Sequence, residues 1–135
     1  MPEIEWKPSY SVGVIRCDSD HRGLVGIINE LYAAMKSGSG RSVMGDIVAR
    51  LANYTRSHFR GEEELMARTS YPELAAHRAE HQNFVDAVEK FQADLEAGAV
   101  GQTIQVADFL YDWLINHIQR TDKLYTAHLN AAGIR

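Results

Sequence analysis

The chain has 135 residues, 45% of them hydrophobic, and a formal net charge of -4 at pH 7, which suits one domain with one continuous core. Its lysines and arginines are dispersed rather than gathered in a stripe, which excludes the basic surface typical of nucleic-acid-binding proteins. No apolar run approaches the roughly 20 residues of a membrane-spanning helix, so we expect no membrane insertion. Cys17 is the only cysteine, so no intrachain disulfide can form, and we expect a cytoplasmic protein.

Residues 1–17 are predicted to form an irregular or extended arm that packs its apolar side chains against the body of the protein. These side chains are Trp6, Tyr10, Val12 and Val14. The first ten residues, MPEIEWKPSY, contain two glutamates and no long apolar run, which is unlike a secretory signal.

Two long helices are predicted after the arm. Apolar residues recur at helical spacing after Asp18 and Ser19, both good N-cap types, and this pattern stops at SGSG, residues 37–40. A second run of helical period extends from Val43 to about Arg68. We therefore expect two helices joined by a short connection.

Two more helices are predicted in the second half of the chain. Ser70 lies three residues before Glu73 with a proline between them, which predicts a capping box at the start of a helix. The helical period that follows continues to AGAVG, residues 97–101, and a fourth run begins near Thr103. The last 13 residues, 123–135, are expected to add one or two short helical turns.

Four amphipathic helices with short connections, and no strand-like alternation outside the arm, favour an all-α protein. We predict an up-down-up-down four-helix bundle with an N-terminal extended arm and a short C-terminal helical segment. The chain would form a single domain over residues 1–135, with the arm in 1–17, the bundle in 18–122 and the C-terminal segment in 123–135.

Histidine is the most informative residue type, because its copies fall on the apolar stripes of the predicted helices. His58 follows Leu51 by seven residues, and His81 precedes Phe84 by three. A buried imidazole without a partner loses its contact with water and gains nothing in return. Five imidazoles that face one small core are too many to find separate hydrogen-bond partners, so we expect them to share one bound partner.

The candidate ligand set consists of five histidines and two carboxylates, namely His21, His58, His77, His81, His117, Glu62 and Asp122. A single H-x-x-x-E or H-x-x-x-H pair is usually a surface feature, but here all four predicted helices contribute. Seven ligands are too many for one ion, since a tetrahedral zinc is full at four. Two ions that share both carboxylates and one solvent-derived oxygen would leave one ion closed and the other with a vacant position. Imidazole and carboxylate together suit iron, and a vacancy beside an apolar wall suits O₂.

The fourth helix should be irregular between His117 and Asp122. Five residues at 3.6 per turn leave the two side chains roughly 140° apart on a straight helix. Both can reach one metal pair only if the helix ends, kinks or takes a π-bulge at this point.

Five short motifs, in order along the chain, resemble those of the hemerythrin family, and in particular the single-domain bacteriohemerythrins. They are EWKPSYSVGV in the arm, then DSDH, HFRGEE, HRAEH and WLINHIQRTDK. The resemblance extends over nearly the whole chain, since the motifs are spread from the arm to the end of the fourth predicted helix. Cys17 and Ser19 depart from the residues expected just before the first histidine, although His21 itself is in place.

The resemblance implies two non-haem iron ions (Fe²⁺ or Fe³⁺) with a bridging oxo or hydroxo group. His77, His81 and His117 would hold the closed iron, His21 and His58 the open iron, and Glu62 and Asp122 would bridge the two. The positions expected to line a dry O₂ pocket, or else to be plain core, are Leu24, Phe59, Trp113, Leu114 and Ile118. His128 has no counterpart as a ligand, and we expect it at the surface or beside a ligand.

The leading interpretation is a binding protein rather than an enzyme: a monomeric, reversible O₂ carrier or store for oxygen-requiring enzymes. A diiron oxidase or ferroxidase of the ferritin-like kind would use Glu-x-x-His pairs, and no glutamate lies three residues before any histidine here. Sensing of O₂, NO or redox state would need a partner protein for its output, because only residues 123–135 follow Asp122. A role in iron handling or peroxide removal remains open.

Overall fold

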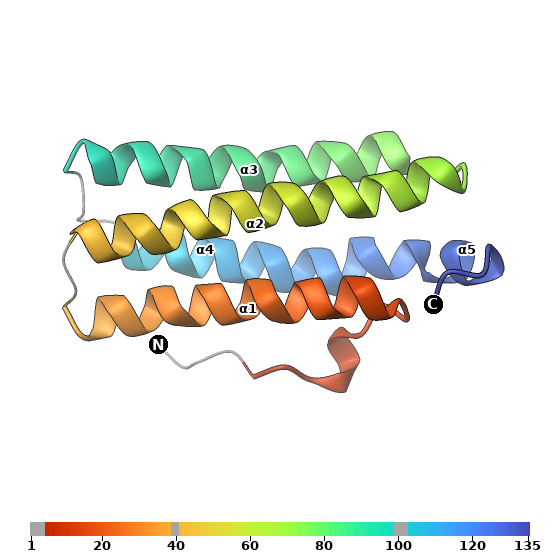
Figure 1. Cartoon of the computed structure of the whole chain (residues 1–135), viewed down its shortest axis with the longest axis horizontal. Helices are drawn as coiled ribbons and strands as arrows, with labels where there is room; N and C mark the ends of the chain where they lie inside the picture. Colours follow the sequence, from red (N-terminus) through yellow and green to blue (C-terminus); the bar gives the residue numbers. More distant parts are fainter. Residues whose placement is uncertain (1–4, 39–40, 99–102) are drawn as a thin grey trace.

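The computed structural model, shown in Figure 1, describes residues 5–38, 41–98 and 103–135. Four long helices follow one another in antiparallel order: α1 (Ile15–Lys36), α2 (Arg41–Arg68), α3 (Leu74–Glu96) and α4 (Thr103–Asn116). Helices α1 and α3 each contact both α2 and α4, so the four helices enclose one core. The described residues contain no strand. The predicted all-α, up-down-up-down bundle is confirmed.

Short elements occupy one end of the bundle and the arm. The arm contains the 3₁₀ turn η1 (Pro8–Tyr10). After α4 the chain continues as the π-helix η2 (His117–Thr121), the 3₁₀ turn η3 (Asp122–Tyr125) and α5 (Thr126–Ala131). The expected C-terminal helical segment is therefore present. No helix of the described residues is long and apolar enough to cross a membrane.

The arm runs beside α1 (Figure 1) and packs its apolar side chains against the body as predicted: Tyr10, Val12 and Val14 are buried and Trp6 is half-buried. The predicted start of the first helix at Asp18 or Ser19 is wrong, because α1 begins at Ile15 after the N-cap Val14. Asp18 instead lies in the first turn of α1, where its carboxylate accepts hydrogen bonds from the backbone N–H of Val12 (2.8 Å) and the hydroxyl of Ser11 (2.6 Å). Asp18, the predicted N-cap, thus holds the arm against α1.

The predicted capping box at Ser70 and Glu73 is also wrong. Ser70 has φ +56°, and the N–H of Tyr71 donates to the carbonyl of Met66 (2.9 Å), which is the Schellman arrangement that ends a helix. Ser70 therefore terminates α2. Helix α3 begins at Leu74, and its N-cap Glu73 makes no side-chain capping bond.

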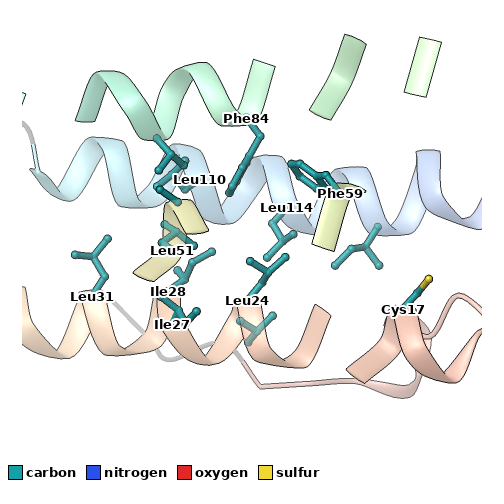
Figure 2. Close-up of a cluster of buried hydrophobic side chains, with 14 of the residues drawn as sticks. Cys17, Leu24, Ile27, Ile28, Leu31, Leu51, Phe59, Phe84, Leu110 and Leu114 are labelled. Atoms are coloured by element: carbon teal, nitrogen blue, oxygen red, sulfur yellow. The ribbon is translucent and has the colours of Figure 1, made fainter. Parts of the chain in front are cut away.

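The apolar core lies between the inward faces of the four helices (Figure 2). Figure 2 shows Leu24, Ile28 and Leu31 on α1, all fully buried, at the three- and four-residue spacing that keeps side chains on one helical face. Burial of a side chain of this size stabilises the fold by roughly 1.5–3 kcal/mol. The core therefore holds the helices in fixed register and gives the polar side chains at one end a rigid frame.

Gly13 lies where the arm meets the C-terminal segment, and alanine at this position should destabilise the protein. Gly13 has φ +70°, and an added Cβ would lie 2.8 Å from Cγ2 of Thr126, whose hydroxyl donates to the carbonyl of Val12. We expect Gly13→Ala to lower the free energy of unfolding by roughly 1–3 kcal/mol from backbone strain, plus the cost of the clash. Urea denaturation measures this loss.

The matched control is Gly133→Ala. Gly133 has φ +85°, but an added Cβ there would meet nothing within 4 Å, so this variant reports the strain alone. An effect at Gly13 no larger than that at Gly133 would show that the contact with Thr126 adds nothing to stability.

Candidate metal centre

Eight polar or charged side chains are buried in the described part of the chain, and seven of them are the predicted ligands. The seven are His21, His58, Glu62, His77, His81, His117 and Asp122. They come from α1, α2, α3, η2 and η3, at the end of the bundle where α1 begins and α2 ends (Figure 1). A buried charge without compensation is costly, so these clustered carboxylates and imidazoles indicate a site for a bound cation.

The ligand atoms of these residues fall into two overlapping groups. One group comprises Glu62, His77, His81, His117 and Asp122, and the other comprises His21, His58 and Glu62; within each group the atoms lie within 4.8 Å of one another. Three histidines thus face one position and two face the other. This is the same division that the family resemblance implies, and metal binding by these residues remains our prediction.

Both carboxylates lie between the two sets of histidines. Glu62 places Oε1 3.1 Å from Nε2 of His81, and it places Oε2 3.2 Å from Nε2 of both His21 and His58. Asp122 places Oδ1 2.9 Å from Nε2 of His117 and Oδ2 3.1 Å from Nε2 of His21. Each carboxylate can therefore serve both positions at once, as a bridging ligand must.

The fourth helix changes to a π-helix where the two side chains have to converge. Element η2 begins at His117, and the N–H of Asp122 donates to the carbonyl of His117 five residues earlier. This wider turn brings both residues to one side of the helix, whereas a regular α-helix would separate them by about 140°. The predicted irregularity is confirmed.

The inward-facing atoms suit a metal ion because they lack hydrogen-bond partners. Nε2 of His58, His77, His81 and His117 is buried and unpartnered, as are Oε1 of Glu62 and both carboxylate oxygens of Asp122. A buried unsatisfied polar atom costs about 1–3 kcal/mol. A mixed set of imidazole nitrogens and carboxylate oxygens fits iron and similar transition metals better than it fits a hard cation such as calcium.

The buried carboxylates dominate the electrostatics of the site. Burial lowers the pKa of His21, but the carboxylates of Asp122 (3.1 Å) and Glu62 (3.2 Å) beside its Nε2 outweigh burial and raise this pKa to about 10. Burial likewise lowers the pKa of His77, and the same two carboxylates raise it to about 9. Burial alone would raise the pKa of Glu62, but the surrounding imidazoles hold it well below its usual range. Burial and the charge of Glu62 raise the pKa of Asp122, but the neighbouring His117 and His21 outweigh both and lower it, so both central carboxylates are ionised among the imidazoles.

Three further carboxylates, which the sequence analysis missed, hold the outer nitrogens of the histidines. Asp20 lies 2.9 Å from Nδ1 of His58 and Glu63 lies 2.8 Å from Nδ1 of His81. The third, Glu80, lies 3.3 Å from Nδ1 of His117. A signal for them was present in the sequence, since each is the immediate chain neighbour of a predicted ligand.

Tyr125 is a second feature that the sequence analysis missed. Its ring is fully buried and lies parallel to the ring of His77, with 5.7 Å between the ring centroids. Its hydroxyl donates a hydrogen bond of 2.8 Å to Oε2 of Glu62. A bridging carboxylate is thereby held in place by a group outside the ligand set.

The predicted pocket residues divide into two sets. Phe59 stacks on His81 with ring centroids 3.8 Å apart, and Trp113 stacks on His117 at 4.4 Å. These two rings therefore lie against histidines assigned to the closed position. The other three, Leu24, Leu114 and Ile118, are fully buried aliphatic side chains. A role in lining an O₂ pocket remains a prediction for all five.

His128 and Cys17 stand outside the ligand groups. His128 is half-buried, and its Nε2 lies 2.7 Å from the carbonyl oxygen of Thr69, so it joins α5 to the end of α2. Cys17 is buried, and its pKa is raised chiefly by that burial and further by the charge of Glu62. A thiol held protonated in this way is a poor nucleophile and a poor metal ligand.

Known proteins resemble this chain along nearly its full length. Residues 12–129 match the family model described as the hemerythrin HHE cation binding domain. A bacteriohemerythrin of Methylococcus capsulatus is 34% identical over 132 residues, which cover 97% of this chain and 100% of that protein. Myohemerythrin-1 of Phascolopsis gouldii is 30% identical over 125 residues, which cover 92% of each chain.

The three-dimensional comparison agrees with these matches. A solved structure of wild-type hemerythrin superposes with a TM-score of 0.88 at 31% identity, covering 95% of this chain and 98% of the other. Sequence, fold and the placement of the seven buried side chains all lead to the same assignment. The chain belongs to the hemerythrin family.

Proposed function

We propose that the chain holds two non-haem iron ions with a bridging oxo or hydroxo group and binds O₂ reversibly, as a store or carrier for oxygen-requiring enzymes. The observation that carries this proposal is the pair of overlapping ligand groups that share Glu62. An iron pair in these groups would supply the redox-active metal that O₂ binding requires.

The histidines are unequally divided, and this supports one position as the site of O₂ binding. His77, His81 and His117 would give three nitrogens to one ion, whereas His21 and His58 would give two to the other. With both carboxylates shared, the second ion has one protein ligand fewer. We therefore assign the O₂-binding position to the side of His21 and His58.

The chain also supplies a dry surrounding for the site. Three aliphatic side chains are each at most 1% exposed and are therefore almost inaccessible to water: Leu24, Leu114 and Ile118. Exclusion of water removes a source of protons and a route of escape for reduced oxygen. This apolar surrounding favours binding over reaction, as a carrier needs and an oxidase does not.

An oxygen electrode separates a carrier from an enzyme. The iron-loaded chain, reduced without air and freed of excess reductant, should take up about one O₂ per iron pair and then stop, because binding is stoichiometric. Purging with argon should return the gas. The zinc-loaded chain is the control, since zinc has no redox chemistry and should take up none. Continued uptake with added reductant, or release of peroxide in place of O₂, would favour an oxidase.

A further inference from the structure

The three outer carboxylates form a repeating arrangement around the bundle. Asp20 on α1 contacts His58 on α2, and Glu63 on α2 contacts His81 on α3. In the same sense, Glu80 on α3 contacts His117 at the start of η2. Helices α1, α2 and α3 thus each supply a carboxylate to a histidine on the next helical element.

Helical geometry explains why each carboxylate is the sequence neighbour of a ligand. Adjacent residues on an α-helix point about 100° apart. When Glu62 points into the centre, Glu63 therefore points sideways toward α3, and Glu80 points toward η2 in the same way beside His81. Two consecutive residues can thus provide one metal ligand and one support for a ligand on the neighbouring helix.

These contacts fix which nitrogen of each imidazole faces the centre. An ionised carboxylate only accepts hydrogen bonds, so Nδ1 of the histidine must be the donor. Nε2 is then left with its lone pair, and Nε2 of His58, His81 and His117 is the buried atom that lacks a partner. His21 differs, because its Nδ1 is buried without a hydrogen-bond partner.

We propose that Asp20, Glu63 and Glu80 are positioning residues that hold three of the histidines and bias the metal centre toward its ferric state. The proposal rests on the function proposed above. A carboxylate on Nδ1 makes the imidazole a stronger electron donor. A stronger donor stabilises the ion of higher charge, so removing the carboxylate should favour the ferrous state.

Glu63 is the most informative of the three to test. Its side chain is 23% exposed, against 32% for Asp20 and 43% for Glu80, so solvent screens its charge least. It also makes the shortest of the three contacts, and Nε of Arg78 donates a second hydrogen bond to it (3.1 Å). In Glu63→Gln the amide oxygen can still accept from Nδ1, so the charge is removed while the imidazole keeps its support.

The matched control is Glu64→Gln, which removes the same charge from the next residue of α2. Glu64 is exposed and makes no hydrogen bond or ion pair among those seen in the described residues. Any effect of a lost charge acting at a distance should therefore appear in both variants. An effect through His81 should appear only in Glu63→Gln.

The experiment measures the reduction potential and the retention of iron against a competing chelator in iron-loaded protein. For Glu63→Gln we expect iron affinity to fall 10–100-fold and the ferric-to-ferrous ratio at a fixed potential to fall about tenfold, or about 59 mV for a one-electron couple. Glu64→Gln should match the unmodified chain. Equal shifts in the two variants, or none in Glu63→Gln, would overturn the proposal. An unmodified chain that holds no iron pair would instead refute the proposed function itself.

Discussion

His81→Ala should lose its iron, whereas His128→Ala should keep it. His81 is the more deeply buried of the two: its Nε2 lies 3.1 Å from Oε1 of Glu62, and its ring stacks on Phe59. Alanine would remove a nitrogen ligand and leave the charge of Glu62 less well compensated. Because metal binding and folding are coupled, the loss should also lower the melting temperature.

His128 is the matched control because it is the one histidine outside both ligand groups. Its replacement should cost about 1 kcal/mol for the lost hydrogen bond to the carbonyl of Thr69. The measurement is the iron content per chain after desalting, with circular dichroism to establish that both variants are folded. Equal loss of iron from the two would mean that the histidines have been sorted wrongly.

Leu114→Ala should assemble the metal centre but lose its oxygenated form faster than the unmodified chain. Leu114 is buried and lies three residues before His117, so its side chain covers the same face of α4 one turn away. Truncation opens space in which water can approach the centre and supply protons. The lost packing should also lower stability by roughly 2–5 kcal/mol.

Leu110→Ala separates this effect from a general loss of packing. Leu110 is fully buried on the same helix, seven residues before His117, and Figure 2 shows it on α4 away from Leu114. The decay of the oxygenated absorption spectrum is compared at matched iron content. Acceleration in Leu114→Ala alone supports a role in keeping the site dry. Unchanged decay, or equal acceleration in both variants, would make Leu114 an ordinary core residue.

The helices and the burial of the candidate histidine ligands were predictable because both depend on hydrophobic periodicity. His58 and His81 occupy positions that an apolar residue would otherwise fill, and this marks them as buried polar groups that need a partner. The π-helix was predictable by angle alone, since His117 and Asp122 could not converge on a regular helix. Each inference used a constraint that is local in the sequence.

The ends of helices and the outer carboxylates were harder to predict because they depend on contacts between segments. Asp18 and Ser70 are residue types that usually start helices. In the structure the carboxylate of Asp18 accepts a hydrogen bond from the arm, and Ser70 adopts a left-handed conformation at the end of α2. Glu63 and Glu80 look like solvated charges until the neighbouring helix is in place. Only the packed bundle shows that each meets a histidine nitrogen.

The central claim is that the buried histidines and carboxylates hold an iron pair that binds O₂ and releases it again. An absorption spectrum of the iron-loaded, reduced protein tests this claim most directly when it is recorded without air, after air, and after the gas is removed. We expect a charge-transfer band to arise with air, to disappear when the gas is removed, and to return over repeated cycles. A spectrum that fails to respond to air, or that changes once and never reverts, would contradict reversible O₂ binding at this site.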